Sequence, residues 1–413
     1  MKTKRLARAA LLFFSILLVL LAASLFYLLP KKLFREPSGP YSVGTTIRYA
    51  VDAARDEILS PQPGDKRELL LQIWYPAADN DLPRASYGTH MPETIAAMSD
   101  DLGVPSFLLR HLEDVRSYSA LNAPMSGEES AYPVILFSHG FGLYGFQNTF
   151  QMEELASQGY IVAAIQHPYH SVLTVFEDGR TAAAPPNELP PFEQFMAMND
   201  MLNGIWVKDA QFVLDELERL NRGGEDGLLS QRLDLAKVGM LGHSYGGAAA
   251  AQMLLLDPRV KAAVNLDGSL TGTGRIPATG FGKPYMQLST EQAPQDGDSF
   301  SEAPLQDAGF PQEEIERHQA FLQTYADNQR NALRNGGYHV RLKGASHYTF
   351  TDIVLYSPIV PFVLKDKIDA KAAHDAINEY TLAFFDHALR GIGSPLPDRP
   401  STDAAEVAVN GDA

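Results

Sequence analysis

The chain comprises 413 residues, with 34 basic and 50 acidic side chains, a formal net charge of −16 and no cysteine. The lack of cysteine excludes disulfides, thiolate metal sites and a cysteine nucleophile, and the acidic balance argues against nucleic acid as a partner. A content of 45% hydrophobic and 20% charged residues is typical of a globular protein that can bury an extensive core.

The N-terminal segment differs from the rest of the chain in charge and hydropathy. Residues 1–35 carry seven basic side chains and no acidic one, so residues 36–413 have a net charge of −23. Residues 9–29 are uncharged and almost entirely apolar. As an α-helix, a stretch of about 21 residues matches the roughly 30 Å hydrocarbon core of a bilayer. Segment 1–35 is therefore predicted to contain one transmembrane helix that acts as an uncleaved signal anchor.

Two other interpretations of this segment remain open. A cleaved signal peptide is compatible with the small residues Ala22, Ala23 and Ser24, although its apolar region is usually only about 7–15 residues long. A buried core helix of this length without a charged residue is disfavoured. The short basic N-terminus favours the cytoplasmic side of the membrane. The acidic body is thus expected to be membrane-anchored and extracytoplasmic, either periplasmic or extracellular, with a secreted form if cleavage occurs.

After a Pro/Gly-rich connector at 36–40, the run ELLLQIWY at 68–75 predicts a strand that stops at Pro76. Residues 77–130 mix polar loop with one expected amphipathic helix, Ser106–Val115. The pattern then becomes regular. Short apolar runs alternate with helical stretches, which is typical of a parallel sheet covered on both faces. The predicted strands are 133–138, 160–166, 237–241, 260–266, 284–288 and 338–342, and the predicted helices are 151–157, 191–220, one from Gly246, and 370–389.

These elements predict an α/β fold in which residues 36–392 form one domain around a mostly parallel, doubly wound sheet. Two lid-like insertions are expected at about 77–130 and 270–335. Residues 393–413 are expected to be a polar, disordered tail.

A motif of the form G-x-S-x-G stands where the strand 237–241 meets the next helix. It reads Gly242-His243-Ser244-Tyr245-Gly246. In a strand-turn-helix context this pattern is a nucleophile elbow, in which the tight turn tolerates no Cβ at the glycine positions. Ser244 is the candidate nucleophile of an α/β-hydrolase fold. The plainer alternative is a glycine-rich turn that only packs.

A serine hydroxyl needs a base to take its proton and a carboxylate to orient that base. In this fold the chain order is Ser, acid, His. His347 follows the strand 338–342 by a short loop and is the candidate base. The other downstream histidines, which are interpreted as solvated or packed, are His318, His339, His374 and His387.

Two carboxylates stand at strand ends and leave the acid undecided. Asp267 ends the strand 260–266, and Glu291 lies just past the strand 284–288. From their positions alone, either reaches the base.

The negative charge that develops on a substrate oxygen needs hydrogen-bond donors. The amide of Tyr245, next to the nucleophile, is one expected donor. The loop after strand 133–138 supplies the second, with the Phe141 amide as the candidate. His139 in this loop is interpreted as a residue that holds the loop rather than as a base. The pair His167 and His170 is interpreted as a pocket wall rather than a metal site, because no carboxylate is nearby in sequence.

Taken in this order, the elbow GHSYGG, the loop FSHGFG and the segments VNLDG and GASHYTFTD resemble the platelet-activating factor acetylhydrolase family, a branch of the α/β-hydrolases. The resemblance extends from about Leu69 over roughly three quarters of the chain. It implies Ser244, Asp267 and His347 as the triad, and so favours Asp267 over Glu291. It also implies the amides of Phe141 and Tyr245 as the oxyanion hole, and hydrolysis of short or oxidised acyl esters, including phospholipid esters, without calcium or a cofactor.

The sequence therefore predicts a membrane-anchored serine carboxylic-ester hydrolase with a small-molecule or lipid ester as substrate and neither cofactor nor metal. The segments 106–115 and 270–335 are hypothesised to form walls or a lid over the elbow. Alternatives are an amide, peptide or polyester hydrolase with the same triad, and a non-catalytic binding protein with a hydrolase fold. Oligomeric state is left open.

Overall fold

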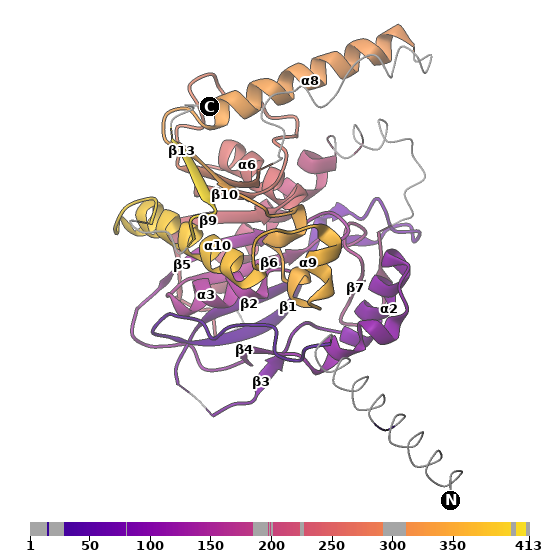
Figure 1. The fold of residues 1–413 in the computed structure, drawn as a ribbon, viewed down its shortest axis with the longest axis vertical. Helices are drawn as coiled ribbons and strands as arrows, with labels where there is room; N and C mark the ends of the chain where they lie inside the picture. The colour runs from indigo at the N-terminus through magenta and orange to yellow at the C-terminus, as the bar shows by residue number, and fades with distance from the viewer. Residues whose placement is uncertain are drawn as a thin grey trace, which may run out of the picture.

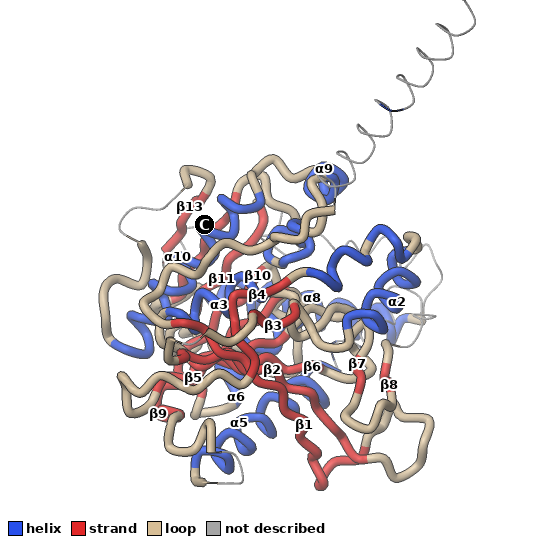
Figure 2. Tube along the Cα trace, turned by 90° about the horizontal axis from the view of Figure 1, so that it is seen from below, coloured by secondary structure: helices blue, strands red, loops and turns tan. Residues whose placement is uncertain are grey.

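A computed structural model describes residue 15 and residues 29–79, 81–184, 197, 199, 201–223, 227–291, 311–397 and 402–409. Within these residues, eleven strands form a central sheet in the order β13-β12-β11-β10-β9-β5-β6-β2-β1-β4-β3, with helices around it (Figures 1 and 2). Its strands are β1 (Ser42–Asp56), β2 (Lys66–Ala77), β3 (Arg84–Ser86), β4 (Arg116–Leu121), β5 (Tyr132–Ser138), β6 (Ile161–Gln166), β9 (Leu233–His243), β10 (Val260–Leu266), β11 (Tyr285–Thr290), β12 (Gly337–Leu342) and β13 (Ala405–Val409). A separate small hairpin pairs β7 (Thr174–Val175) with β8 (Thr181–Ala182).

The described α-helices are α2 (Met91–Leu102), α3 (Thr149–Ser157), α5 (Val207–Asn221), α6 (Tyr245–Leu256), α8 (Gln312–Ala332), α9 (Ile359–Leu364) and α10 (Ala370–Phe385). Two π-helical segments are η3 (Leu202–Trp206) and η7 (Asp386–Arg390). The 3₁₀ segments are η1 (Ser106–Leu108), η2 (Arg110–Asp114), η5 (His347–Phe350) and η6 (Asp352–Leu355). Helix α8 extends from one end of the molecule (Figure 1).

The middle of the sheet is parallel, from β6 through β5, β9, β10 and β11 to β12. On one side it continues through the antiparallel neighbours β2 and β1, and on the other it ends with antiparallel β13. Helices α5 and α6 pack on one face, and α3 and α10 pack on the other. This confirms the prediction of a mostly parallel sheet covered on both faces.

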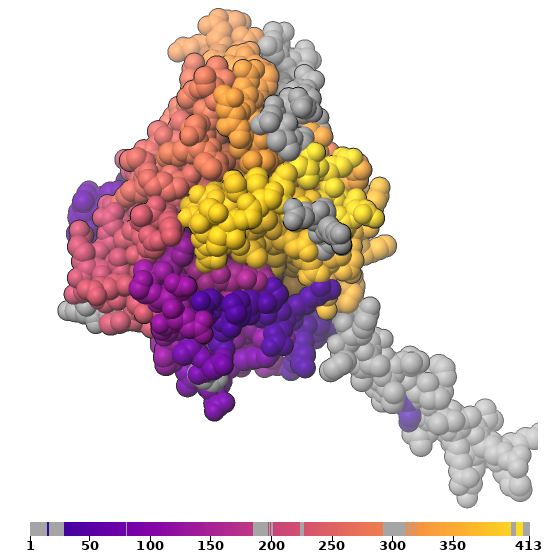
Figure 3. Space-filling model, turned by 90° about the vertical axis from the view of Figure 1, so that its left-hand side faces the viewer, coloured from indigo at the N-terminus to yellow at the C-terminus, as the bar shows by residue number. Residues whose placement is uncertain are grey.

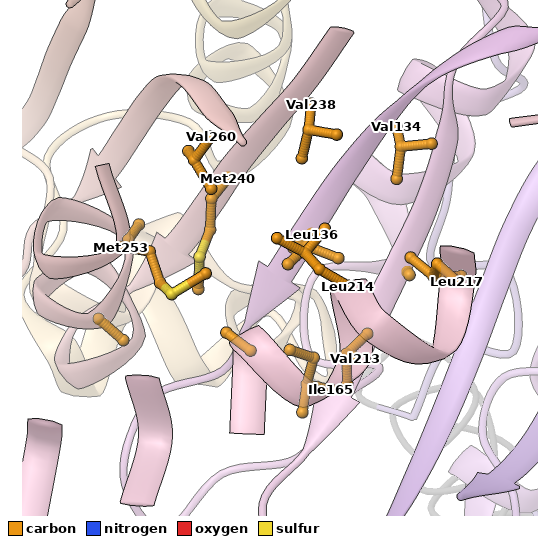
Figure 4. Packing of buried hydrophobic residues seen from close by; sticks show 14 of the residues in the cluster. Val134, Leu136, Ile165, Val213, Leu214, Leu217, Val238, Met240, Met253 and Val260 are labelled. Atoms are coloured by element: carbon orange, nitrogen blue, oxygen red, sulfur yellow. The ribbon is translucent and has the colours of Figure 1, made fainter. Parts of the chain in front are cut away.

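Burial on both sides explains why the central strands are apolar along their whole length. Every residue of β5 and of β6 is buried. Helix α5 contributes an apolar stripe at helical spacing, which packs over β5, β6 and β9. Figure 4 shows the buried hydrophobic cluster to which this packing belongs, with Val134, Leu136, Ile165, Val213, Leu214, Leu217, Val238, Met240, Met253 and Val260 labelled.

Several predicted elements differ from the observed ones. Pro76 does not end its strand, which continues to Ala77. The pairing of β2 with β6 ends at Trp74, so at Pro76 the strand has no β6 neighbour and the missing N–H is tolerated. The helix expected at Ser106–Val115 is wrong. That segment forms η1 and η2, closed by bonds between residues three apart, such as Leu112 N to Leu109 O at 2.9 Å.

Structure also appears where none was predicted. Strand β1 pairs with β2 along most of its length, and helix α2 lies within the insertion at 77–130. The tail expected to be disordered contains β13, which pairs with β12. The surface view shows the C-terminal part of the chain lying against the body (Figure 3). Of the predicted helix 191–220, most of the first half lies outside the described residues, and the rest is η3 and α5.

Among the described residues, no helix is long and apolar enough to cross a membrane. The predicted span, residues 9–29, lies outside the described residues except for Ser15 and Leu29.

Candidate active site

Ser244 stands at a sharp turn between β9 and α6. Its backbone has φ 55° and ψ −120°, a conformation that is strained for a residue with a Cβ. The turn is held from both sides, since Ser244 N donates to Leu266 O at 2.8 Å and Gly247 N donates to Ser244 O at 2.9 Å. This is the geometry of a nucleophile elbow, which presents the serine side chain at the carboxyl end of the sheet.

The two glycines of the motif are required by close backbone contacts. A Cβ on Gly242 would lie 2.1 Å from Gly246 O, and a Cβ on Gly246 would lie 2.0 Å from Ser138 O. Neither neighbour is a flexible side chain that moves aside. The two glycines of the motif are therefore required by contacts within the elbow and between the elbow and the end of β5.

His347 and Asp267 meet beside this turn. Asp267 follows β10 directly, with φ 53°, and its Oδ2 lies 2.7 Å from His347 Nδ1. Its other oxygen, Oδ1, accepts the backbone N–H of Thr290 at 2.8 Å. The carboxylate can only accept a hydrogen bond, so Nδ1 carries the proton of the neutral imidazole. Nε2 is then unprotonated, and its lone pair can accept a proton. The His347 side chain remains 41% exposed, so solvent and substrate reach it.

Glu291, the other candidate acid, lies elsewhere. It follows β11, and its side chain is exposed. Its charge contributes, after that of Glu406, to raising the pKa of Lys343. The carboxylate that contacts His347 is that of Asp267.

His243 is a residue that the sequence analysis did not assign. Its Nε2 donates to the backbone oxygen of His347 at 3.0 Å, and the two rings lie 4.6 Å apart. Burial, and then the neighbouring His347, hold the pKa of His243 well below its usual value, so it stays neutral as a donor. The only sequence signal for this contact is its place before Ser244, because the segment that it holds lies 104 residues further along the chain.

The loop after β5 lies against the elbow. A Cβ on Gly140 would be 3.4 Å from Ser244 Cβ. The Gly140 amide donates to Gln147 Oε1 at 2.9 Å, and the Gly142 amide donates to His170 O at 2.8 Å. The Phe141 amide lies between these two fixed groups. The segment 139–142 is called the oxyanion loop below, after the role that the sequence predicts for it.

Among the other downstream histidines, His339 and His374 have structural partners. His339 Nε2 bonds Ser289 Oγ at 2.7 Å, and burial lowers the pKa of His339 to about 4. His374 stacks on Phe150 and bonds two backbone oxygens of the segment after His347. The side chain of His318 lies outside the described residues.

His139 holds its loop, as the sequence analysis interpreted it. Its Nδ1 donates to Gly140 O at 2.7 Å, and its Nε2 accepts the His167 amide at 3.1 Å. His170 Nδ1 accepts Trp206 Nε1–H at 2.7 Å. Within the described part of the chain, no three His, Asp or Glu side chains are arranged to hold a metal ion.

An apolar cavity of about 480 Å³ begins beside the oxyanion loop. Gly142, Leu143 and Tyr348, which follows His347, are among the residues that line it. Residues of α2, η1, η2 and α9 also line it, so the insertion at 77–130 supplies part of the wall. Apolar lining with few polar groups suits an acyl or other apolar chain.

The sequence matches the family described as platelet-activating factor acetylhydrolase, isoform II, over residues 27–391. It is 27% identical to a platelet-activating factor acetylhydrolase of Cavia porcellus, in an alignment covering 85% of this chain and 77% of that protein. It is 25% identical to a probable 1-alkyl-2-acetylglycerophosphocholine esterase of Arthroderma benhamiae, covering 62% and 64%. Among solved structures, a ferulic acid esterase from Streptomyces cinnamoneus is similar, with a TM-score of 0.66, 28% identity, and coverage of 92% and 98%.

Proposed function

The chain belongs to the platelet-activating factor acetylhydrolase, isoform II, family and is a carboxylic-ester hydrolase, and we propose that it cleaves short-chain or oxidised acyl esters, phospholipid esters included, through Ser244, Asp267 and His347. The observation that carries this proposal is the 2.7 Å contact of His347 Nδ1 with Asp267 Oδ2 beside the strained elbow.

In the proposed mechanism, Ser244 Oγ attacks the ester carbonyl carbon while His347 Nε2 takes its proton. The carbonyl oxygen becomes an oxyanion, which accepts hydrogen bonds from the amides of Phe141 and Tyr245. The tetrahedral intermediate collapses, the C–O bond to the alcohol breaks, and His347 gives its proton to the leaving oxygen. Water then attacks the acyl-enzyme by the same route, which releases the acid and restores Ser244. Asp267 keeps the imidazole in the required tautomer throughout.

The cavity beside the oxyanion loop supports an apolar substrate. Exposed apolar side chains of α9 border it, among them Ile359 and Val363. Leu29, the last residue of the predicted membrane span, also lines it. This arrangement supports a cavity that opens toward the membrane side of the protein. The proposed anchor is residues 9–29, with the acidic body extracytoplasmic; fractionation of cells before and after carbonate extraction tests this part separately.

Fluorophosphonate labelling and an acyl-length series of p-nitrophenyl esters test the proposed triad and substrate. Wild type is expected to be labelled and to prefer short acyl groups, and Ser244→Ala is expected to lose both labelling and turnover. Ser269→Ala, at an exposed serine two residues after Asp267, is the matched control and should behave as wild type. Hydrolysis that survives Ser244→Ala would refute the proposed nucleophile.

Two added substrates separate the alternatives. A hydroxycinnamate ester tests the activity of the similar solved structure, which is a ferulic acid esterase. An acyl anilide tests amide cleavage. Faster turnover of the cinnamate or the anilide than of the acetyl ester would contradict the proposed substrate class while leaving the triad intact.

A further inference from the structure

A second Asp–His–Ser array lies directly behind the oxyanion loop. His167 Nδ1 is 2.8 Å from Asp209 Oδ2, and His167 Nε2 is 2.8 Å from Ser138 Oγ. The three side chains come from the first turn of α5, the residue after β6 and the last residue of β5. The connectivity of atoms is that of a catalytic triad, but all three residues are 0% exposed.

Burial excludes Ser138 as a nucleophile, because no substrate carbonyl reaches its hydroxyl. The hydrogen bonds of the array instead fix where the protons of His167 and Ser138 lie. Burial lowers the pKa of His167, which is therefore neutral. The pKa of Asp209 is depressed because the Arg67 guanidinium and the His167 bond outweigh the opposing effect of burial. The Nδ1 proton of His167 thus points to Asp209, and its Nε2 accepts the Ser138 hydroxyl proton.

Arg67 ties this array to the turn that follows β6. It donates to Asp209 through Nε at 3.0 Å and Nη2 at 2.6 Å. Its Nη1 donates to Glu57 at 2.6 Å and to the backbone oxygen of Pro168 at 3.2 Å. The next residue, Tyr169, has φ 63°, so the turn is held in a left-handed conformation that is uncommon outside glycine. A buried ion pair therefore sets the shape of the segment 167–170.

That segment in turn holds the oxyanion loop at both ends. The His167 amide donates to His139 Nε2 at 3.1 Å, and His170 O accepts the Gly142 amide at 2.8 Å. Trp206 closes the arrangement by stacking on His167 with ring centroids 3.9 Å apart. Hydrogen bonds, together with the backbone of the segment 167–170, thus link Asp209 to His139 and Gly142 at the two ends of the oxyanion loop.

We infer that Asp209, His167 and Ser138 are positioning residues that fix the oxyanion loop in the geometry needed for the reaction. The inference rests on the proposed function, in which the Phe141 amide stabilises the oxyanion. Such a donor acts on charge that develops in the transition state, so loosening the loop reduces kcat while substrate binding in the apolar cavity persists. Affinity for a transition-state analogue falls with kcat for the same reason.

The test measures kcat, KM and the inhibition constant of a trifluoromethyl ketone for the full-length protein. Ser138→Ala is expected to lower kcat roughly 10- to 100-fold, with KM within about twofold, and to weaken inhibition in proportion. Ser138→Thr restores the hydroxyl and most of kcat. The matched control is Ser117→Ala on β4, a buried serine whose hydroxyl lies 2.9 Å from Ser119 Oγ, and it should retain wild-type kinetics.

A double-mutant cycle separates positioning from loss of stability. His167→Asn keeps a donor toward Asp209 and removes the acceptor for Ser138. If the two residues act as one array, the double variant loses no more kcat than the worse single variant. Additive losses, or losses that track the thermal midpoint and are not restored by Thr, would overturn the inference. So would wild-type kcat and inhibition in Ser138→Ala. These results leave the proposed function standing, because its failure appears in Ser244→Ala instead.

Discussion

At the scale of single residues, the contact of Asp267 with His347 predicts a large difference between two carboxylates. Asp267→Asn replaces the carboxylate that accepts the Nδ1–H hydrogen bond with an amide that can donate to Nδ1. This favours the tautomer in which Nε2 carries the proton and cannot act as the base. We expect kcat for a soluble acetyl ester to fall about 10³- to 10⁴-fold. Glu291→Gln, which removes an exposed charge, should change kcat less than about twofold. A comparable loss in both variants would contradict the assignment of the acid.

Gly246 gives a second prediction, which concerns folding. Because its Cβ would lie 2.0 Å from Ser138 O, Gly246→Ala must displace the end of β5 or the start of α6. Overpacking of this kind lowers the free energy of unfolding by about 1–3 kcal/mol. We expect a value near the upper end, because the atom that the Cβ would meet belongs to the backbone. Urea denaturation measures it. Gly127→Ala, at a glycine with open space around it, is the control, and an equal loss there would show that the elbow is not the cause.

The residues of the candidate site were predictable to different degrees. Ser244 and His347 follow from local patterns, a motif and a strand-end loop. Asp267 could not be separated from Glu291 by position, because both follow a strand of the same sheet, and only the fold shows which oxygen meets Nδ1. His243 and the Asp209–His167–Ser138 array depend on contacts between residues far apart in the sequence, which no local pattern carries.

At the scale of elements, the central parallel strands were predictable because burial on both faces requires continuous apolar runs. The flanking strands β1, β4 and β13 lie outside that rule, since each has exposed residues and mixed composition. Segment 106–115 has the spacing of an amphipathic helix, yet Leu112 and His111 are buried by two short 3₁₀ turns. Phe107 and Leu108 of the same segment are exposed, so the apolar spacing predicted neither the type of helix nor a single buried face.

Strand β13 gives a prediction at this scale. It pairs with β12 along five residues, and Lys343 N donates to Ala404 O at 2.8 Å. Ending the chain after Pro397 removes these bonds and exposes an edge of β12. At about 1 kcal/mol for each of several hydrogen bonds, we expect a loss of roughly 3 kcal/mol in the free energy of unfolding. Ending the chain after Val409 is the control. Equal stability of the two truncated chains would show that β13 does not stabilise the sheet.

At the scale of the whole molecule, buried histidines predict how stability depends on pH. Burial lowers the pKa of His374 to about 4, against its backbone hydrogen bonds and the charge of Asp369. Between about pH 4 and 6.5 the unfolded chain binds a proton at this imidazole and the folded chain does not, so stability falls as the solution is acidified.

The measurement compares wild type with His374→Gln in urea at pH 7 and pH 5. The variant is expected to be less stable at pH 7 but to lose about 2 kcal/mol less on going to pH 5. His387→Gln, at an exposed imidazole, is the control and should keep the wild-type difference. An unchanged pH difference in His374→Gln would show that this group does not contribute to acid sensitivity.

The distribution of charge and apolar surface predicts how the whole molecule meets a lipid substrate. The body, residues 36–413, has a net charge of −23, so anionic head groups repel it. Attraction must therefore come from apolar contact. Val363 on α9 lines the cavity, and its neighbour in sequence, Phe362, is also exposed; their exposed fractions are 66% and 83%. Burying such side chains in lipid contributes about 1–3 kcal/mol each.

We expect Phe362→Ser combined with Val363→Ser to lower hydrolysis of an acetyl phospholipid in zwitterionic vesicles by about 10-fold or more. Turnover of soluble p-nitrophenyl acetate should stay within about twofold, because both side chains are largely exposed and neither belongs to the proposed triad. A chain starting at Pro30 separates this effect from that of the predicted anchor. Ile58→Ser, at a side chain 74% exposed in the turn between β1 and β2, is the matched control. Equal losses on vesicles and on the soluble ester would contradict this prediction. They would show that the substitutions alter the cavity itself rather than contact with lipid.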